Sequence, residues 1–487
     1  MKMKIEGSGS TDRRRDDVIR TWLVKQGYHP PTDGYDTFCD EMLDWYKGYV
    51  EDFHKYSVNT GAKKVSVVRY SLGMAKMIAE DYANLLLNEK VKITADSAFA
   101  KQLDAILQDN DFFVRANNLL ELAFAIGTGA LVEYQGADGS PIIDFVPGVM
   151  VYPLKWDMQR ITECAFGSLI ENGSDDVTYY VQHHVLENGT YHIHNTYLNK
   201  KGENIDLPKE LEADVDTKCT VPTFQIVRPN IVNSYSLYNP MGMSVYGNAV
   251  DLLKAVDLVY DAYVNEFSLG RTRMIIPSGI AKLVMQEDGT ATLKFDPNDV
   301  VTYAYDSKDP NAKPEYIQPK LRADSFELGL QRNLNLLAKK CGLGNDRYQF
   351  DASGVKTATE VISEKSELYQ SMKKHEILLR SALIGMGRAL AQMCGHRDTT
   401  ITIDFDDSII EDRGTMIQRH IDLVNAKLES KKTAIMDINH CDEAAAEMEL
   451  AQIANEDSIT GAPDDWYKED GVADDAGAGE ETGEADS

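Results

Sequence analysis

Between Leu321 and Ala391 the chain contains two long helical segments separated by a short break, and this pattern constrains the fold more than any other stretch. The apolar residues of the first segment recur at steps of three and four, which places them on one helix face: Phe326, Leu330, Leu334, Leu337 and Cys341. Gly342 and Gly344 are expected to end this helix, because glycine readily takes the left-handed conformation that closes a helix C-terminus.

The second helical segment begins near Thr357 and is predicted to extend to about Met393. Thr357 and Glu360 fit a capping box, in which the hydroxyl and the carboxylate each bind a backbone N–H of the first turn. Gly385 and Gly387 lie inside the segment, and each costs about 1 kcal/mol relative to alanine in a helix interior. We therefore expect a bend near these glycines.

A further helix is predicted upstream, from Asn248 to about Phe267, with an apolar stripe and a polar stripe that includes Asp257 and Asp261. Residues 271–320 then change character, because short strand-like runs are separated by prolines. This pattern indicates a small insertion with strands between two long helices.

Residues 130–232 are predicted to be rich in β structure. Val177–Leu186 and Thr190–Tyr197 both alternate with period two, which is typical of half-buried strands. Asn188-Gly189 between them is a strong signal for a two-residue hairpin turn.

The predicted hairpin places three imidazoles on one face of a sheet, with His183 across from His194 and His192 beside them. Three imidazoles on one face could ligate zinc or iron. The alternative is a polar face directed at solvent. We favour that alternative, because no nearby aspartate or glutamate has a spacing that would complete a metal site.

Carboxylates cluster after a strand-like run that ends at Phe405: Asp404, Asp406, Asp407, Glu411 and Asp412. Such a cluster could hold magnesium for nuclease chemistry. However, a helix is predicted from about Arg413, and acidic side chains are favourable at a helix N-terminus. We interpret these acids as helix-capping groups, and we expect neither a metal nor another cofactor.

Residues 35–57 carry aromatic residues at helical spacing, which predicts a helix with an aromatic face. Residues 1–12 are expected to be disordered. The same holds for residues 456–487, where acids far outnumber bases and glycine and alanine recur.

A formal net charge of −28 argues against conventional DNA binding, because proteins that hold nucleic acid by neutralising phosphate are basic. Composition alone favours the interpretation that this acidity only aids solubility. The six cysteines form no Cys-x-x-Cys pair, which predicts reduced thiols of an intracellular protein. The N-terminus has no apolar signal core, and no run reaches the roughly 18 apolar residues of a membrane span.

Motifs of the common enzyme classes are missing from the sequence. Gly127-Thr-Gly129 precedes a predicted strand, whereas a dinucleotide-binding fingerprint follows a strand and opens a helix. The chain lacks the Gly-x-x-x-x-Gly-Lys-Ser/Thr loop of P-loop ATPases, and it lacks Gly-x-Ser-x-Gly and His-Glu-x-x-His. We therefore expect a protein that is not an enzyme.

The stretch from Leu321 to Ala391 resembles the portal proteins of tailed bacteriophages, in particular the siphophage-like portals. The resemblance is most specific at Cys341-Gly-Leu-Gly, at Lys356-Thr-Ala-Thr-Glu-Val361 and at Phe405-Asp-Asp-Ser-Ile-Ile-Glu-Asp412, and it extends loosely over roughly residues 35–440. It implies an α+β class: a mainly helical portal fold with long stem helices, a β-rich wing region and a small α/β clip insertion.

The resemblance also implies a division of the chain. It comprises a partly disordered N-terminal arm (1–34), a wing of helices followed by a β-rich region (35–246), a stem helix (247–270), a clip (271–320), a second stem helix (321–342), a tunnel loop (343–356), a long bent helix and wing strand (357–405), crown helices (406–455) and a disordered acidic tail (456–487).

In portals the tunnel loop projects into a central channel. This implies that DNA-facing candidates lie in the loop: Asn345, Asp346, Arg347, Tyr348, Gln349, Asp351, Ser353 and Lys356. From the residues alone, we interpret the loop as an ordinary connection in a helical hairpin, because most such loops only join two elements.

Portals form a dodecameric ring at one capsid vertex, which is the channel for DNA packaging and ejection. A helix is about 10–12 Å across, so a dozen side by side would enclose a bore of roughly 30 Å, wide enough for a duplex. The implied location is the portal vertex of the virion, after assembly in the host cytoplasm. The alternative function is a metal-dependent hydrolase or nuclease that uses the histidine face or the carboxylates at 404–412.

The resemblance implies several macromolecular partners and no membrane. They are double-stranded DNA that passes without sequence-specific binding, the large terminase, the major capsid and scaffolding proteins, and head-completion or adaptor proteins.

Overall fold

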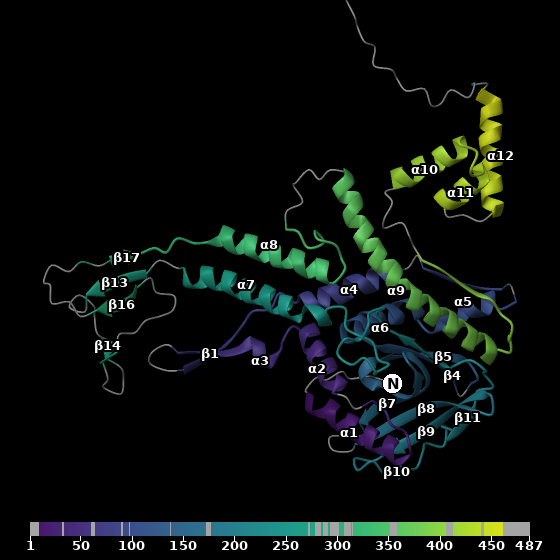
Figure 1. Ribbon diagram of the computed structural model, residues 1–487, viewed down its shortest axis with the longest axis horizontal. Helices are drawn as coiled ribbons and strands as arrows, with labels where there is room; N and C mark the ends of the chain where they lie inside the picture. Colours follow the sequence, from purple (N-terminus) through teal and green to yellow (C-terminus); the bar gives the residue numbers. More distant parts are fainter. Residues whose placement is uncertain are drawn as a thin grey trace, which may run out of the picture. The chain divides into compact units, whose positions relative to one another are not determined.

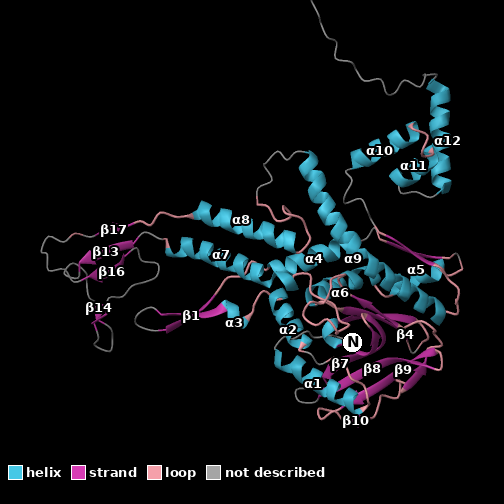
Figure 2. Cartoon of the chain, in the orientation of Figure 1, coloured by secondary structure: helices cyan, strands magenta, loops and turns pink. Residues whose placement is uncertain are grey.

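The structure is a computed structural model, and the chain forms two compact units, Met1–Asp406 and Asp407–Ser487. The residues that it describes are 9–31, 34–59, 64–88, 91–96, 98–136, 138–171, 177–270, 273–277, 284–285, 291–292, 301–305, 313, 315–350, 358–405, 413–439 and 443–460. Figures 1 and 2 show the elements of both units.

The largest sheet of the first unit has the strand order β10-β9-β8-β7-β6, with β11 added against β9. Its strands are β6 (Val151–Asp157), β7 (Arg160–Glu171), β8 (Val177–Glu187), β9 (Thr190–Leu198), β10 (Asn204–Ile205) and β11 (Asp214–Asp216). Helix α1 (Gly9–Lys25) covers one face of this sheet, where Trp22 is buried in one apolar cluster with Val181. The expected disorder of residues 1–12 is therefore wrong from Gly9 onward, and residues 1–8 lie outside the described part.

The predicted hairpin between β8 and β9 is confirmed. Asn188 and Gly189 have φ angles of 50° and 94°, the left-handed conformation that a two-residue turn of this type needs at both positions. The register places His183 opposite His194, as the sequence predicts.

A second sheet, with the order β12-β4-β5, lies against helices α6 and α9. Its strands are β4 (Gly129–Gln135), β5 (Pro141–Pro147) and β12 (Phe224–Val227). The surrounding helices are α2 (Tyr35–Tyr46), α4 (Met74–Leu86), α5 (Ala100–Asp109) and α6 (Phe112–Ile126), and two short 3-10 turns are η1 (Gly148–Met150) and η2 (Gly247–Ala249). Fully buried side chains at this core include Tyr82, Phe124 and Tyr246.

The helix predicted for residues 35–57 is interrupted. Helix α2 ends at Tyr46, α3 covers only Glu51–His54, and strand β1 (Lys55–Asn59) then pairs with β2 (Lys64–Val68). Gly48, with a φ of 77°, lies at the interruption and supplies the left-handed conformation that ends the helix.

Two long helices, α7 (Val250–Leu269) and α8 (Ala323–Lys340), lie side by side (Figure 1). Between them the chain forms short strands: β13 (Arg273–Pro277), β14 (Val284–Met285), β15 (Ala291–Thr292), β16 (Val301–Tyr305) and β17 (Glu315–Ile317). They pair as a three-stranded sheet of order β16-β13-β17 and a two-stranded sheet of β14 and β15. The two predicted helices and the insertion with strands are thus confirmed.

Helix α9 (Ala358–Met393) is assigned as one continuous helix, and its glycines allow close packing. A Cβ at Gly385 would lie 2.1 Å from the Gln225 side chain of β12, and one at Gly387 would lie 2.9 Å from Ile401. Ile401 belongs to β18 (Ile401–Asp404), which pairs with β3 (Lys92–Ala95). Because neither glycine carries a side chain, β12 and β18 can pack directly against α9. This close packing offsets the low helix propensity of the two glycines.

The second unit contains α10 (Arg413–Asn425), α11 (Lys431–Asn439) and α12 (Glu443–Thr460). Lys432 of α11 contacts Glu443 and Glu447 of α12, which joins these two helices. Residues 456–460 are helical, so the expected disorder of residues 456–487 is wrong at its start.

The mainly helical α+β class predicted from the sequence is confirmed. The five cysteines within the described residues carry free thiols, as expected. Among the described helices, none combines the length and the apolar character that a membrane crossing requires.

Candidate functional site

Helices α7 and α8 form an antiparallel pair that is held together by apolar side chains and by an ion pair. Its buried side chains include Leu253 and Val256 of α7 and Leu330, Leu334 and Leu337 of α8. At the end next to the inserted strands, the Arg322 guanidinium donates two hydrogen bonds to the Glu266 carboxylate, at 3.1 and 2.8 Å. These hydrogen bonds lower the pKa of Glu266.

Helix α7 is fixed near its middle by two buried carboxylates, Asp257 and Asp261. Asp257 accepts a hydrogen bond from the backbone N–H of Leu72 at 2.8 Å, and its Oδ2 lies 3.1 Å from Nε2 of the fully buried His54. Asp261 accepts from the backbone N–H of Tyr70 at 3.1 Å. The two aspartates of the polar stripe are therefore buried and attach α7 to the segment that follows β2.

The break after α8 begins with two left-handed glycines, as predicted. Gly342 and Gly344 both have a φ of 84°. A Cβ at Gly342 would lie 2.6 Å from the Ser371 hydroxyl of α9, and the Tyr82 hydroxyl of α4 donates to the Cys341 carbonyl at 2.7 Å. The break is thus enclosed between α4 and α9, and a side chain at Gly342 would not fit there.

One carboxylate of α4 holds two of the candidate loop residues. Arg347 donates to Asp81 from Nε at 3.2 Å and from Nη2 at 2.8 Å, and the Tyr348 hydroxyl donates to the same carboxylate at 2.7 Å. The hydrogen bonds to Asp81 raise the pKa of Arg347, while burial raises the pKa of Tyr348. The positive charge of Arg347 is therefore already neutralised within the chain.

A second contact folds the loop onto α8. The Gln331 side-chain amide donates to the Tyr348 carbonyl at 3.1 Å and accepts from the Phe350 N–H at 2.9 Å. Asn345 donates to the Asp346 carboxylate at 3.0 Å. The described half of the loop, up to Phe350, is consequently held by defined contacts.

The candidates divide into two sets. Five of them lie in this held segment: Asn345, Asp346, Arg347, Tyr348 and Gln349. The other three lie outside the described residues: Asp351, Ser353 and Lys356. Thr357 of the predicted capping box also lies outside them. Sequence reasoning missed Asp81 and Gln331. Asp81 is 266 residues away from Arg347, and a single aspartate on a helix surface gives no local signal of such a partner.

The histidine face differs from its prediction in two ways. His183 is 7% exposed and stacks on Trp22 with ring centroids 5.1 Å apart, so at this position the face is covered rather than open to solvent. Burial lowers the pKa of His183 to about 4, which keeps the imidazole neutral.

Acidic side chains lie next to the other two histidines, which the sequence spacing did not indicate. Asp214 Oδ1 is 3.2 Å from His192 Nδ1 and 3.4 Å from His194 Nδ1, and Glu187 is 3.0 Å from His194 Nε2. Strand β11 supplies Asp214 by pairing with β9, which sequence spacing did not reveal.

Of the two metal sites considered from the sequence, the histidine face lies within the described residues and the carboxylate cluster lies mostly outside them. Among the described side chains, the donor atoms that converge as a possible metal-binding group belong to the second unit, not to the histidine face. Of the predicted carboxylate cluster, Asp404 lies in β18 opposite Lys92, and the residues at 406–412 lie outside the described part.

Comparisons with known proteins give a family and a solved structure. The family model described as phage portal protein, SPP1 Gp6-like, matches residues 36–460. A search of curated proteins finds no match. A chain in a solved structure, the neck of a native GTA particle computed with C12 symmetry, is similar at 10% sequence identity and a TM-score of 0.38, over 75% of this chain and 88% of that chain.

Proposed function

The chain belongs to the phage portal proteins of the SPP1 Gp6-like family, and we propose that twelve copies form a ring at one capsid vertex, through which DNA is packaged and ejected. The match over residues 36–460 carries this proposal, because it includes α7, α8, the inserted strands and the break after α8.

Within such a ring, α7 and α8 would be the stem and the strands between them the clip. For the other parts of the chain we propose the wing, tunnel loop and crown that the resemblance to portals implies. A stem needs two helices that move as one body, and the described contacts support this role. Arg322 and Glu266 join the helices at the strand end, while Asp257 and Asp261 attach the middle of α7 to the segment that follows β2.

We propose that duplex DNA passes the ring without being gripped. The formal net charge of −28 disfavours strong binding to phosphate, and Arg347 is neutralised by Asp81. Contact with DNA would then depend on the outer part of the loop at 343–356, beyond the segment that Asp81 and Gln331 hold.

The proposed protein partners follow from the same role. The ring would dock the large terminase during packaging and head-completion or adaptor proteins afterwards, and it would contact the major capsid and scaffolding proteins. In this proposal the chain is a structural component of the virion rather than an enzyme.

The first experiment is the mass of the purified full-length chain in solution by light scattering, together with negative-stain images of the same sample. We expect rings of about twelve chains with a central hole. The same measurement is made after coexpression with the scaffolding and major capsid proteins, so that assembly that depends on them is also detected. A monomer or dimer in both preparations would contradict the proposal.

A further inference from the structure

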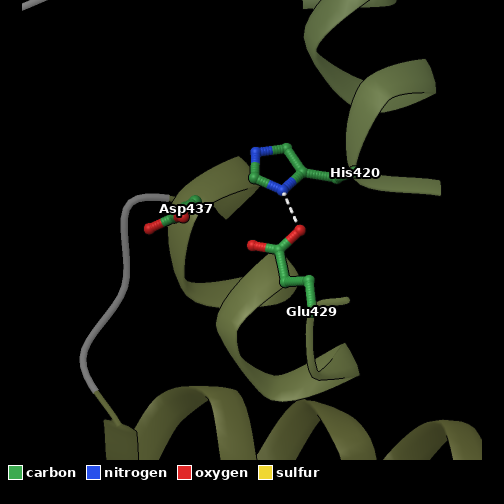
Figure 3. Close-up of side chains that lie close together, drawn as sticks. All are labelled: His420, Glu429 and Asp437. Atoms are coloured by element: carbon green, nitrogen blue, oxygen red, sulfur yellow. Dashed lines mark hydrogen bonds and ion pairs between the residues drawn. The ribbon is translucent and has the colours of Figure 1, made fainter. Parts of the chain in front are cut away.

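The centre of the second unit brings together three side chains from three different segments. His420 comes from α10, Glu429 from the connection that follows it, and Asp437 from α11 (Figure 3). One donor atom of each lies within 4.8 Å of the others. His420 is 4% exposed, and the side chain of Glu429 is 13% exposed.

We propose that these residues bind a divalent transition-metal ion of the zinc class, which cross-links α10, its connection and α11. The proposal does not depend on ring formation or on DNA passage, because it concerns contacts within one chain.

The donor set selects the class of ion. One imidazole nitrogen with two carboxylates suits zinc and neighbouring first-row metals, whereas magnesium and calcium prefer oxygen donors alone. Three protein ligands leave a fourth tetrahedral position for water. We therefore expect Zn²⁺ to bind and Mg²⁺ to bind far more weakly.

The distances require only small side-chain movements. His420 Nδ1 and Glu429 Oε2 are 2.8 Å apart, which is a hydrogen bond from the imidazole to the carboxylate. In a tetrahedral site with metal–ligand distances of about 2.1 Å, two ligand atoms are about 3.4 Å apart, so a metal would take the place of the shared proton. Asp437 is exposed and can turn its carboxylate toward the pair.

In the part of the second unit whose burial the structure describes, little apolar core holds the helices together. Among its residues whose burial the structure describes, the buried side chains are Ala434, Ala446 and His420. Two alanines supply little hydrophobic stabilisation, and small domains with thin cores commonly depend on a metal or another cross-link. The excess of acids in residues 407–487 also attracts cations to this unit.

The alternative is that His420 and Glu429 form only a hydrogen-bonded ion pair, with Asp437 nearby by chance. The two interpretations differ in the role of Asp437, which an ion pair does not need. They also differ for Glu429→Gln, because the glutamine carbonyl can still accept the hydrogen bond from His420 but is a poor metal ligand.

The test uses the full-length chain, stripped with a chelator and titrated with Zn²⁺, with hydrogen exchange followed in peptides that cover residues 413–439. We expect Zn²⁺ to slow exchange in these peptides, and Mg²⁺ at the same concentration to have no effect. Asp437→Asn and Glu429→Gln should each weaken the Zn²⁺ response at least about tenfold, since loss of a ligand should cost no less than loss of an outer-shell partner.

Asp422→Asn is the matched control, because Asp422 is an exposed aspartate of α10 and its loss removes the same charge from the same unit. This variant should respond to Zn²⁺ like the parent chain. Hydrogen exchange is measured in these peptides rather than over the whole chain, because His192 and His194 in the first unit could bind zinc independently. No slowing by Zn²⁺ in residues 413–439, or equal slowing in Asp437→Asn, would overturn the proposal.

Discussion

Asp81 accepts hydrogen bonds from both Arg347 and Tyr348, and it ties the break after α8 to helix α4. The Arg347 guanidinium and the Tyr348 hydroxyl therefore share one acceptor, the Asp81 carboxylate. A residue that is unremarkable in the sequence thereby fixes the part of the loop that precedes Phe350.

We predict that Asp81→Ala destabilises the chain by about 1–3 kcal/mol, the usual cost when partners of a charged hydrogen bond are left unpaired. Denaturant unfolding measures the loss, and hydrogen exchange should speed up in residues 345–350. Asp104→Ala, at an exposed aspartate of α5, is the control and should change neither quantity. Equal behaviour of the two variants would show that Asp81 does not hold the loop.

His183 gives a prediction for pH dependence. Its pKa in the folded chain is about 4, below the unfolded value of about 6.5, so the unfolded chain takes up this proton first as pH falls. The stability that depends on neutral His183 is complete above about pH 6.5 and is lost between about pH 6.5 and 4. The loss amounts to about 3 kcal/mol.

His183→Phe should remove this part of the acid sensitivity, because phenylalanine can keep the stacking on Trp22 without taking up a proton. Urea unfolding at several pH values between 7 and 4 compares the variant with the parent chain. His29→Phe, at an exposed histidine, should leave the pH dependence as it is. If the free energy of unfolding falls equally with pH in all three proteins, His183 is not the source of the acid sensitivity.

At the scale of elements, the two glycines after α8 combine a local and a tertiary requirement. Their φ of 84° is a backbone preference that the sequence reveals directly. The contact of Gly342 with Ser371 is a tertiary requirement, because it lets α9 pack against the end of α8. The same holds for Gly385 and Gly387, where the sequence suggested a bend and the structure shows close packing.

Gly342→Ala should destabilise the chain by more than the about 1–2 kcal/mol expected for a left-handed L-residue, because its Cβ would also collide with Ser371. Gly395→Ala is the matched control, since Gly395 has a φ of 87° and a Cβ added there would meet no atom within 4 Å. Thermal unfolding of both variants separates strain from collision. Replacing Ser371 by alanine together with Gly342→Ala should recover part of the difference.

For the whole molecule, an acidic chain with a neutralised Arg347 should bind duplex DNA weakly. We predict that Arg347→Gln changes the retention of the full-length protein on duplex DNA less than about twofold at low salt, as does Lys209→Gln, a control at an exposed lysine. A mobility-shift assay over a range of salt concentrations measures this. A tenfold weakening specific to Arg347→Gln would mean that Arg347 leaves Asp81 to contact phosphate.

Local sequence signals were sufficient for several parts of this protein. The hairpin at Asn188-Gly189, the end of α8 at Gly342 and the strands inserted between α7 and α8 all depend on preferences of residues close together in the chain. Such features are predictable because backbone conformation and apolar periodicity act over a few residues. The tunnel loop at 343–356, which the resemblance to portals implies, stays a prediction.

Only the tertiary structure decided which side chains meet. Asp81 reaches Arg347, Asp214 reaches His192, and α1 covers His183, although nothing near these residues in sequence indicates it. A carboxylate has the same local pattern whether it faces solvent or a buried partner, so its role is set by the packing of distant elements. The sequence by itself therefore determined the long helices around the inserted strands and the β8–β9 hairpin, whereas the fold determined which charges are neutralised, because electrostatic partners are chosen by distance in space.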